Sequence, residues 1–194
     1  MQHLTDKQVM LEYQRGEAVA MDELLRRFKN PVYHFAYRLS YNAAEAQEIT
    51  QEVFLRLHEH RANYSPTGKF STWIFTIAHN VFVSRWRKNR RLVLWPRKSS
   101  TSDEPIEVAD PDPIPNEAAQ QNEMSQIIRR CVQTLPFPQK EALLLREFGQ
   151  MDYDEIATIL NKSLGTVKTL IHRARINLKK KLLPYIKELG GYNV

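Results

Sequence analysis

A proline-rich acidic segment divides this chain and limits the folds that it can adopt. Five of the ten prolines fall between residues 96 and 115, around the polar run KSSTSDE and the motif PDPIP. Proline lacks a backbone N–H and fixes φ, so this segment cannot form a helix interior or an inner strand. We therefore expect a linker over residues 92–116. It would join two domains, at 1–91 and 117–194, each large enough for an independent helical fold.

The charge distribution follows the same division. Residues 1–95 carry 14 basic and 9 acidic residues, and residues 123–194 carry 12 basic and 7 acidic residues. Residues 96–122 between them carry 2 basic and 6 acidic residues. Two basic blocks therefore flank an acidic middle, although the whole chain has a net charge of only +6.

The composition excludes several classes of protein. A single cysteine, Cys131, rules out a disulfide framework within the chain and any zinc site that needs two thiolates. Six glycines argue against a glycine-rich phosphate loop. No apolar run approaches the roughly 20 residues of a membrane span, and the polar start MQHLTDKQVMLEYQRG does not resemble a signal peptide. We expect a cytoplasmic protein with no direct membrane insertion.

Apolar residues recur at helical spacing throughout the first domain. The pattern predicts two opening helices separated near Gly16 and another that begins at Pro31. Asn42 and Glu45 then form a capping box for the next helix. A long helix follows over residues 71–91.

The second domain has the same helical character. Its first predicted helix covers residues 117–134 and ends at Pro136. The next predicted helix opens at Pro138. The inward face of the first is expected to present Met124, Ile127, Ile128, Cys131 and Leu135. Because alternating strand patterns of useful length are absent, we predict an all-α protein with two small helical domains.

The segment 152–175 has the pattern of a helix-turn-helix. Asp152 and Glu155 form a capping box, and residues 161–163 form a tight turn. Ser163 can cap a final helix that runs to about Leu183. At about 100° per residue, an inward stripe then forms from Val167, Ile171, Ala174 and Leu178. The outward face carries Lys168, Thr169, His172 and Arg173, with Ile176 among them. This basic face suits a DNA major groove; the alternative is a solvated helix on a structural bundle.

A second candidate surface lies at the end of the first domain. Residues 84–91, SRWRKNRR, hold five basic side chains among eight, and Tyr64, Phe70 and Trp73 surround a Pro/Gly loop upstream. Aromatic rings beside a basic helix can stack unpaired bases while the cations hold the backbone. The sequence leaves open whether Tyr64 and Phe70 are exposed in this way or belong to the core.

Three segments, in order, resemble the bacterial sigma factors of the extracytoplasmic-function group. They are AEAQEITQEVFLRLHEH, KFSTWIFTIAHNVFVSRWRKNRR and LPFPQKEALLLREFGQMDYDEIATILNKSLGTVKTLIHRARINLKKKL. The resemblance implies sigma domains 2 and 4, which bind core RNA polymerase, recognise the −10 and −35 promoter elements and assist melting. It implies contacts with the clamp helices of the largest subunit and with the β flap, and regulation by an anti-sigma factor. It implies no catalytic residue, metal or cofactor.

The resemblance also assigns roles to positions. The polymerase-binding face comprises Glu48, Gln51, Glu52 and Leu55. The loop 63–70 captures a flipped −10 base above the helix that follows it. The −10 contacts comprise Tyr64, Lys69, Phe70, Trp73, Ile77, Asn80, Ser84, Arg85, Arg87 and Lys88. The −35 contacts comprise Thr166, Lys168, Thr169, His172 and Arg173.

Some features depart from the family pattern or admit other functions. Leu170 stands where family members often carry arginine, and Ile176 where a polar residue is more usual. The acidic residues between positions 103 and 112 either mimic nucleic acid or form a plain solvated linker. One rival is a free-standing helix-turn-helix regulator. Another is a nuclease that holds metal through Asp152, Asp154 and Glu155, but acids in a first helical turn are favoured by the helix dipole alone.

Overall fold

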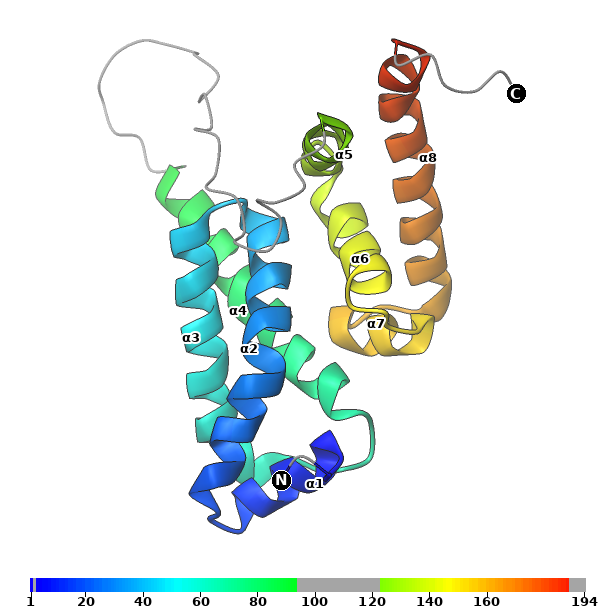
Figure 1. The fold of residues 1–194 in the computed structure, drawn as a ribbon. Helices are drawn as coiled ribbons and strands as arrows, with labels where there is room; N and C mark the ends of the chain where they lie inside the picture. Colours follow the sequence, from blue (N-terminus) through cyan, green and yellow to red (C-terminus); the bar gives the residue numbers. More distant parts are fainter. Residues whose placement is uncertain (2, 94–122, 189–194) are drawn as a thin grey trace. The chain divides into compact units, whose positions relative to one another are not determined.

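The computed structural model describes residues 1, 3–93 and 123–188, which fall into two separate units (Figure 1). Each unit is built from α-helices, and no strand occurs among these residues. The all-α prediction is therefore confirmed for the described ranges. Most of the predicted linker, residues 94–116, and the start of the predicted helix 117–134 lie outside them.

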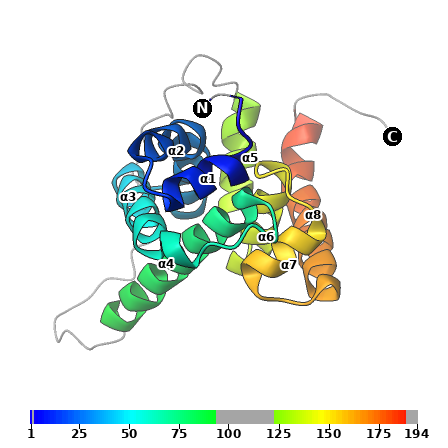
Figure 2. The same ribbon diagram turned by 90° about the horizontal axis from the view of Figure 1, so that it is seen from below.

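The described residues of the first unit form a bundle of four α-helices and one 3₁₀ turn, with its core between α2, α3 and α4. Figures 1 and 2 show α2 and α3 side by side, with α1 across one end. The fully buried side chains include Leu24, Ile49, Leu57 and Ile74. The elements are α1 (Asp6–Gln14), α2 (Ala18–Ser40), α3 (Ala43–His60), η1 (Arg61–Asn63) and α4 (Phe70–Val93).

Helix α2 runs without a break through Pro31. The expectation that a helix begins there is wrong. Proline fits the helical φ, and its cost is the N–H that the carbonyl of Arg27 would otherwise accept. Phe28 and Val32 are buried on either side of the exposed Pro31, so packing against the bundle holds the helix together.

Only half of the predicted capping box at Asn42 forms in the expected way. The Asn42 side chain accepts a hydrogen bond from the backbone N–H of Glu45 at 2.9 Å. The backbone N–H of Asn42 instead donates to the hydroxyl of Ser40 at 3.2 Å. Ser40 thus supplies the acceptor that the capping box assigns to the Glu45 carboxylate.

The described part of the second unit, residues 123–188, contains four helices, with α8 packed against the other three. The predicted inward stripe of α8 is confirmed, since Val167, Ile171 and Ala174 are buried and Leu178 is partly buried. Helix α8 continues past the predicted end at Leu183. The elements are α5 (Glu123–Gln133), α6 (Phe137–Glu147), α7 (Tyr153–Leu160) and α8 (Leu164–Glu188).

The prediction that Ile128 faces inward is wrong, because its side chain is 40% exposed. Met124 and Ile127 are only half-buried, whereas Cys131 and Val132 are buried. The core of the second unit therefore covers only the last turn of α5. Hydrophobic periodicity shows which face of a helix is apolar and does not show how far along the helix a neighbour covers that face.

Candidate functional site

An acidic and amide-bearing face lies along α3. The side chains of Glu48, Gln51 and Leu55 are exposed, and that of Glu52 is half-buried. The Asn42 cap sets the start of the helix, and its buried stripe turns these four residues outward. Leu55 is 61% exposed, so this face presents an apolar side chain beside its carboxylates and amide. The structure therefore brings all four predicted polymerase-binding residues together.

Both carboxylates of this face have partners within the first unit. The Glu52 carboxylate accepts a hydrogen bond from Arg56 Nε at 2.9 Å, one helical turn away. The Glu48 carboxylate accepts from Arg85 Nη1 of α4 at 2.6 Å. Exposed ion pairs of this kind contribute little to folding, so a partner can exchange them at small cost.

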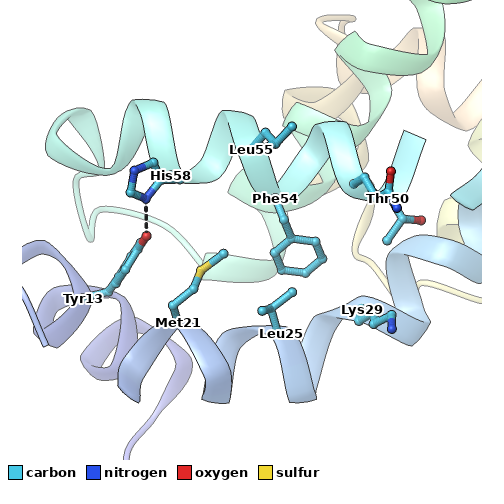
Figure 3. Close-up of a pocket in the computed structure, with 9 residues that line it drawn as sticks. Tyr13, Met21, Leu25, Lys29, Thr50, Phe54, Leu55 and His58 are labelled. Carbon is cyan, nitrogen blue, oxygen red and sulfur yellow. Dashed lines mark hydrogen bonds between the residues drawn. The ribbon is translucent and has the colours of Figure 1, made fainter. Parts of the chain in front are cut away.

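An apolar groove of about 510 Å³ lies beside the face (Figure 3). It opens between α2 and α3, and it shares Gln51 and Leu55 with the predicted polymerase-binding face. The sequence alone does not predict this groove, although Leu24 and Leu25 of α2 are adjacent apolar residues, more than a single narrow core stripe needs. Its lining residues are Tyr13, Met21, Leu25, Lys29, Thr50, Gln51, Phe54, Leu55 and His58.

The aromatic residues around the Pro/Gly loop form part of the core. Tyr64 is 6% exposed and Phe70 is 1% exposed, which decides the alternative that the sequence leaves open. The Phe70 ring lies edge-on to Phe28 at 4.9 Å between centroids, and the Tyr64 ring lies edge-on to Trp73 at 5.0 Å. Tyr64 and Phe70 therefore hold the two ends of the loop and do not present free faces for base stacking.

The remaining residues predicted to contact the −10 element lie on the loop between these rings and on one face of α4. Lys69 and Asn80 are exposed, and Trp73 and Ile77 are half-buried. Trp73, Ile77 and Asn80 are three or four residues apart, so they lie along one side of α4. Further along this helix lie Ser84, Arg85, Arg87 and Lys88, of which only Arg85 is half-buried.

In the second unit, α7 and α8 form the predicted helix-turn-helix. The capping box of α7 is confirmed: Asp152 N–H donates to the Glu155 carboxylate at 2.9 Å. Arg146 fixes the same corner, because its Nη1 donates to the Met151 carbonyl at 2.7 Å. Its guanidinium also lies over the Tyr153 ring, 5.1 Å from the centroid.

The turn between the two helices has the expected chemistry. Asn161 adopts a left-handed conformation with φ +50°, which asparagine tolerates better than most residues. The Ser163 hydroxyl accepts from the Thr166 N–H at 3.2 Å and so caps α8. This short turn fixes the start of α8 relative to α7.

All five predicted −35 residues lie on the exposed face of α8, namely Thr166, Lys168, Thr169, His172 and Arg173. The Thr169 hydroxyl donates to the Gly165 carbonyl at 2.9 Å, so Thr169 presents its methyl group and oxygen lone pairs outward. Behind this face, Arg175 donates to Glu147 of α6 at 2.8 Å, and this bond raises the pKa of Arg175. Asn177 donates to Gln139 of α6 at 2.8 Å.

The three acids that the nuclease alternative assigns to metal binding lie at the N-terminus of α7. Asp152 and Glu155 form the cap of α7, and Asp154 stands beside them in its first turn. In the ranges 3–93 and 123–188, no three His, Cys, Asp or Glu side chains are grouped as a metal site requires. The helices of these ranges also include none with the length and apolarity to cross a bilayer.

Comparison with known proteins identifies the same two units. The family model "Sigma-70 region 2" matches residues 24–92, and "Sigma-70, region 4" matches residues 125–178. The RNA polymerase sigma-H factor of Pseudomonas aeruginosa is 30% identical, with 94% of this chain and 96% of that protein aligned. The ECF RNA polymerase sigma factor SigW of Bacillus subtilis is also 30% identical, over 91% of this chain and 96% of its own length.

A solved structure shows the same fold. The sigma factor RpoE, crystallised with the anti-sigma factor NepR from Bartonella quintana, aligns with a TM-score of 0.64 at 23% identity. The alignment covers 83% of this chain and 95% of RpoE. The matches to region 2 and region 4 occur in this order along the chain, and the 30% identical relatives align with nearly all of it. The chain belongs to the extracytoplasmic-function group of the sigma-70 family, the factors that bind RNA polymerase and initiate transcription.

Proposed function

We propose that this sigma factor divides its work between domains at residues 1–91 and 117–194, joined by a linker over 92–116. The first domain docks on the clamp helices of the polymerase and captures unpaired −10 bases. The second domain anchors the complex on duplex −35 DNA and contacts the β flap. The observation that carries this proposal is the exposure of every predicted −35 residue on α8, combined with the exposed face of α3.

The polymerase-binding surface that we propose includes the apolar groove next to the α3 face. Gln51 and Leu55 belong to both, so one partner helix can cover the polar face and insert an apolar side chain between Leu25 and Phe54. Burial of such a side chain contributes roughly 1.5–3 kcal/mol. The charge change Leu55→Asp should then weaken assembly with core polymerase. Val19→Asp is a matched control, because Val19 is also 61% exposed but lies outside the groove.

For the −10 element we propose two kinds of role. Tyr64 and Phe70 shape the loop from inside the core. Lys69, Trp73, Ile77 and Asn80 face the unpaired bases, and Asn80 suits base recognition because its amide both donates and accepts. The cations Arg85, Arg87 and Lys88, with Ser84, hold the DNA backbone.

The protein would act in the cytoplasm, where it meets the polymerase, without a cofactor and without catalysing a covalent step. An anti-sigma factor is its expected regulator. RpoE from Bartonella quintana is seen in complex with one, and a factor with exposed polymerase and DNA surfaces needs some means of masking them.

Run-off transcription with core polymerase on genomic fragments tests the function and yields the promoter. Transcripts that depend on this protein are the expected result. A gel shift without polymerase separates it from a free-standing regulator. We expect weak binding of the protein alone, whereas tight binding to a two-fold symmetric site would favour the regulator.

A further inference from the structure

The last residue of α1, Gln14, connects that helix to the start of the Pro/Gly loop. Its side-chain Nε2 donates to the backbone carbonyl of Arg61 at 2.6 Å and to that of Tyr64 at 2.9 Å. These two carbonyls bracket η1, and the exposed residues 65–69 follow directly. One amide group therefore holds the entry to the loop from a position about 50 residues earlier in the chain.

The helix that carries Gln14 is itself firmly attached. Val9 and Met10 of α1 are fully buried. Arg27 of α2 donates to the Asp6 carboxylate at 2.7 Å and to the Leu4 carbonyl at 2.9 Å. The position of Gln14 is thus fixed by the bundle, and the loop entry takes its position from Gln14.

At the other end of the loop, the Lys69 carbonyl accepts a hydrogen bond from the Trp73 N–H at 3.4 Å, and the next residue is held by packing. Phe70 is buried against Phe28 and lies 5.9 Å from the Trp73 ring. The backbone of the loop entry has a different restraint, the pair of hydrogen bonds from Gln14. The family match for the first unit begins at residue 24, so it does not include α1.

We propose that Gln14 is a positioning residue for −10 recognition: it sets the backbone of residues 61–64 and thereby places loop 65–69 against the unpaired base. This inference rests on the proposed role of the loop in capturing that base. The glutamine amide suits the task because its two N–H groups match two carbonyl acceptors. Methionine has nearly the same shape and no donor, whereas lysine restores donors for both carbonyls.

The experiment uses the full-length chain with Gln14→Met, Gln14→Lys and Gln8→Met. Gln8→Met is the matched control, because it makes the same substitution on α1 and removes a hydrogen bond from the Thr5 N–H that lies away from the loop and the groove. Three quantities are measured: assembly with core polymerase, holoenzyme binding to a −35 duplex, and holoenzyme binding to a single-stranded −10 oligonucleotide. Both DNA probes come from the promoter that run-off transcription identifies.

A spectroscopic measurement follows the loop without DNA. The chain has three tryptophans, so Trp86→Phe with Trp95→Phe leaves Trp73 as the only one. Trp73 packs against Tyr64, whose carbonyl Gln14 holds. Quenching of Trp73 fluorescence by acrylamide therefore reports whether the loop entry has loosened.

We expect Gln14→Met to bind the −10 strand about tenfold more weakly. The variant loses both hydrogen bonds that hold the loop entry, and together these bonds contribute about a factor of ten to an equilibrium constant. Assembly and −35 binding should stay at wild-type levels, Trp73 quenching should rise, and Gln14→Lys should restore both changed quantities. Unchanged quenching in Gln14→Met, an equal −10 loss in Gln8→Met, or no recovery in Gln14→Lys would each overturn the inference. If the wild-type holoenzyme does not bind the −10 strand, the proposed function of the loop is contradicted instead. Quenching of Trp73 would then still test whether Gln14 holds the loop entry.

Discussion

Arg85 of α4 donates a hydrogen bond to Glu48 of α3, with 2.6 Å between Nη1 and Oε2. A cation assigned to the DNA backbone is thus paired with an acid assigned to the polymerase. In the free protein the two charges neutralise each other. Binding of polymerase to Glu48 would leave Arg85 available for phosphate.

Glu48→Gln should therefore strengthen non-specific binding of the isolated protein to DNA, by about two- to fivefold at low salt. The salt dependence should steepen by about one phosphate contact, since one more cation is free. Titration of a fluorescent duplex over a range of salt concentrations measures both. Glu59→Gln makes the same charge change elsewhere on α3, and equal enhancement in that variant would contradict the release of Arg85.

Reversal of charge in Glu52→Lys should prevent holoenzyme formation while the helical content stays intact. A broken and desolvated charge contact at an interface costs roughly 2–5 kcal/mol. Circular dichroism and a polymerase pull-down measure the two properties. Glu59→Lys is the control on the same helix, and wild-type affinity in Glu52→Lys would remove this residue from the interface.

The two units should fail in different ways. Asn80→Ala should leave binding to a −35 duplex unchanged but impair open-complex formation, and it should alter preference at one −10 base by roughly 1–3 kcal/mol. Arg173→Ala should weaken closed-complex binding with little effect on a pre-melted template. Permanganate footprinting on duplex and pre-melted promoters measures both. If a pre-melted bubble rescues Arg173→Ala no better than Asn80→Ala, the proposed division of labour is wrong.

Two tyrosines near the loop should respond oppositely to loss of their hydroxyl groups. The Tyr64 hydroxyl is buried and has no hydrogen-bond partner among the described residues, and burial raises its pKa. Tyr64→Phe should therefore raise the free energy of unfolding by about 1 kcal/mol. Tyr13→Phe should lower it by a similar amount, because the Tyr13 hydroxyl is bonded to His58. Urea denaturation compares them, and a loss in Tyr64→Phe would mean that its hydroxyl has a partner.

Acid should destabilise the first unit through Glu23. Hydrogen bonds from Arg26 and Arg27 lower the pKa of Glu23 from 4.5 to about 2. Since the pKa is lower in the folded state, this carboxylate stabilises the fold above pH 4.5. Its contribution is lost as the pH falls through 2. Melting temperatures between those pH values should fall less in Glu23→Gln than in wild type. Asp22→Asn, an exposed neighbour, is the control.

The sequence predicted the helix-turn-helix almost completely, because capping residues, turn residues and the apolar stripe of α8 are all local signals. It did not predict that α2 continues through Pro31, since packing on both sides of a proline is a tertiary effect. The burial of Tyr64 and Phe70 also depends on a distant residue, Phe28. The groove beside Leu55 depends on how α2 and α3 pack, and the adjacent apolar residues of α2 do not by themselves specify that packing.

The burial of Tyr64 and Phe70 has a consequence for how promoter preference can change. Both ends of the segment 65–69 are fixed inside the domain, while its five residues are all exposed. If this segment reads the unpaired −10 base as proposed, substitutions in these five positions should alter the preferred base without touching the residues that keep the bundle folded. Under that proposal, promoter preference would evolve through this short segment with little effect on the stability of the domain.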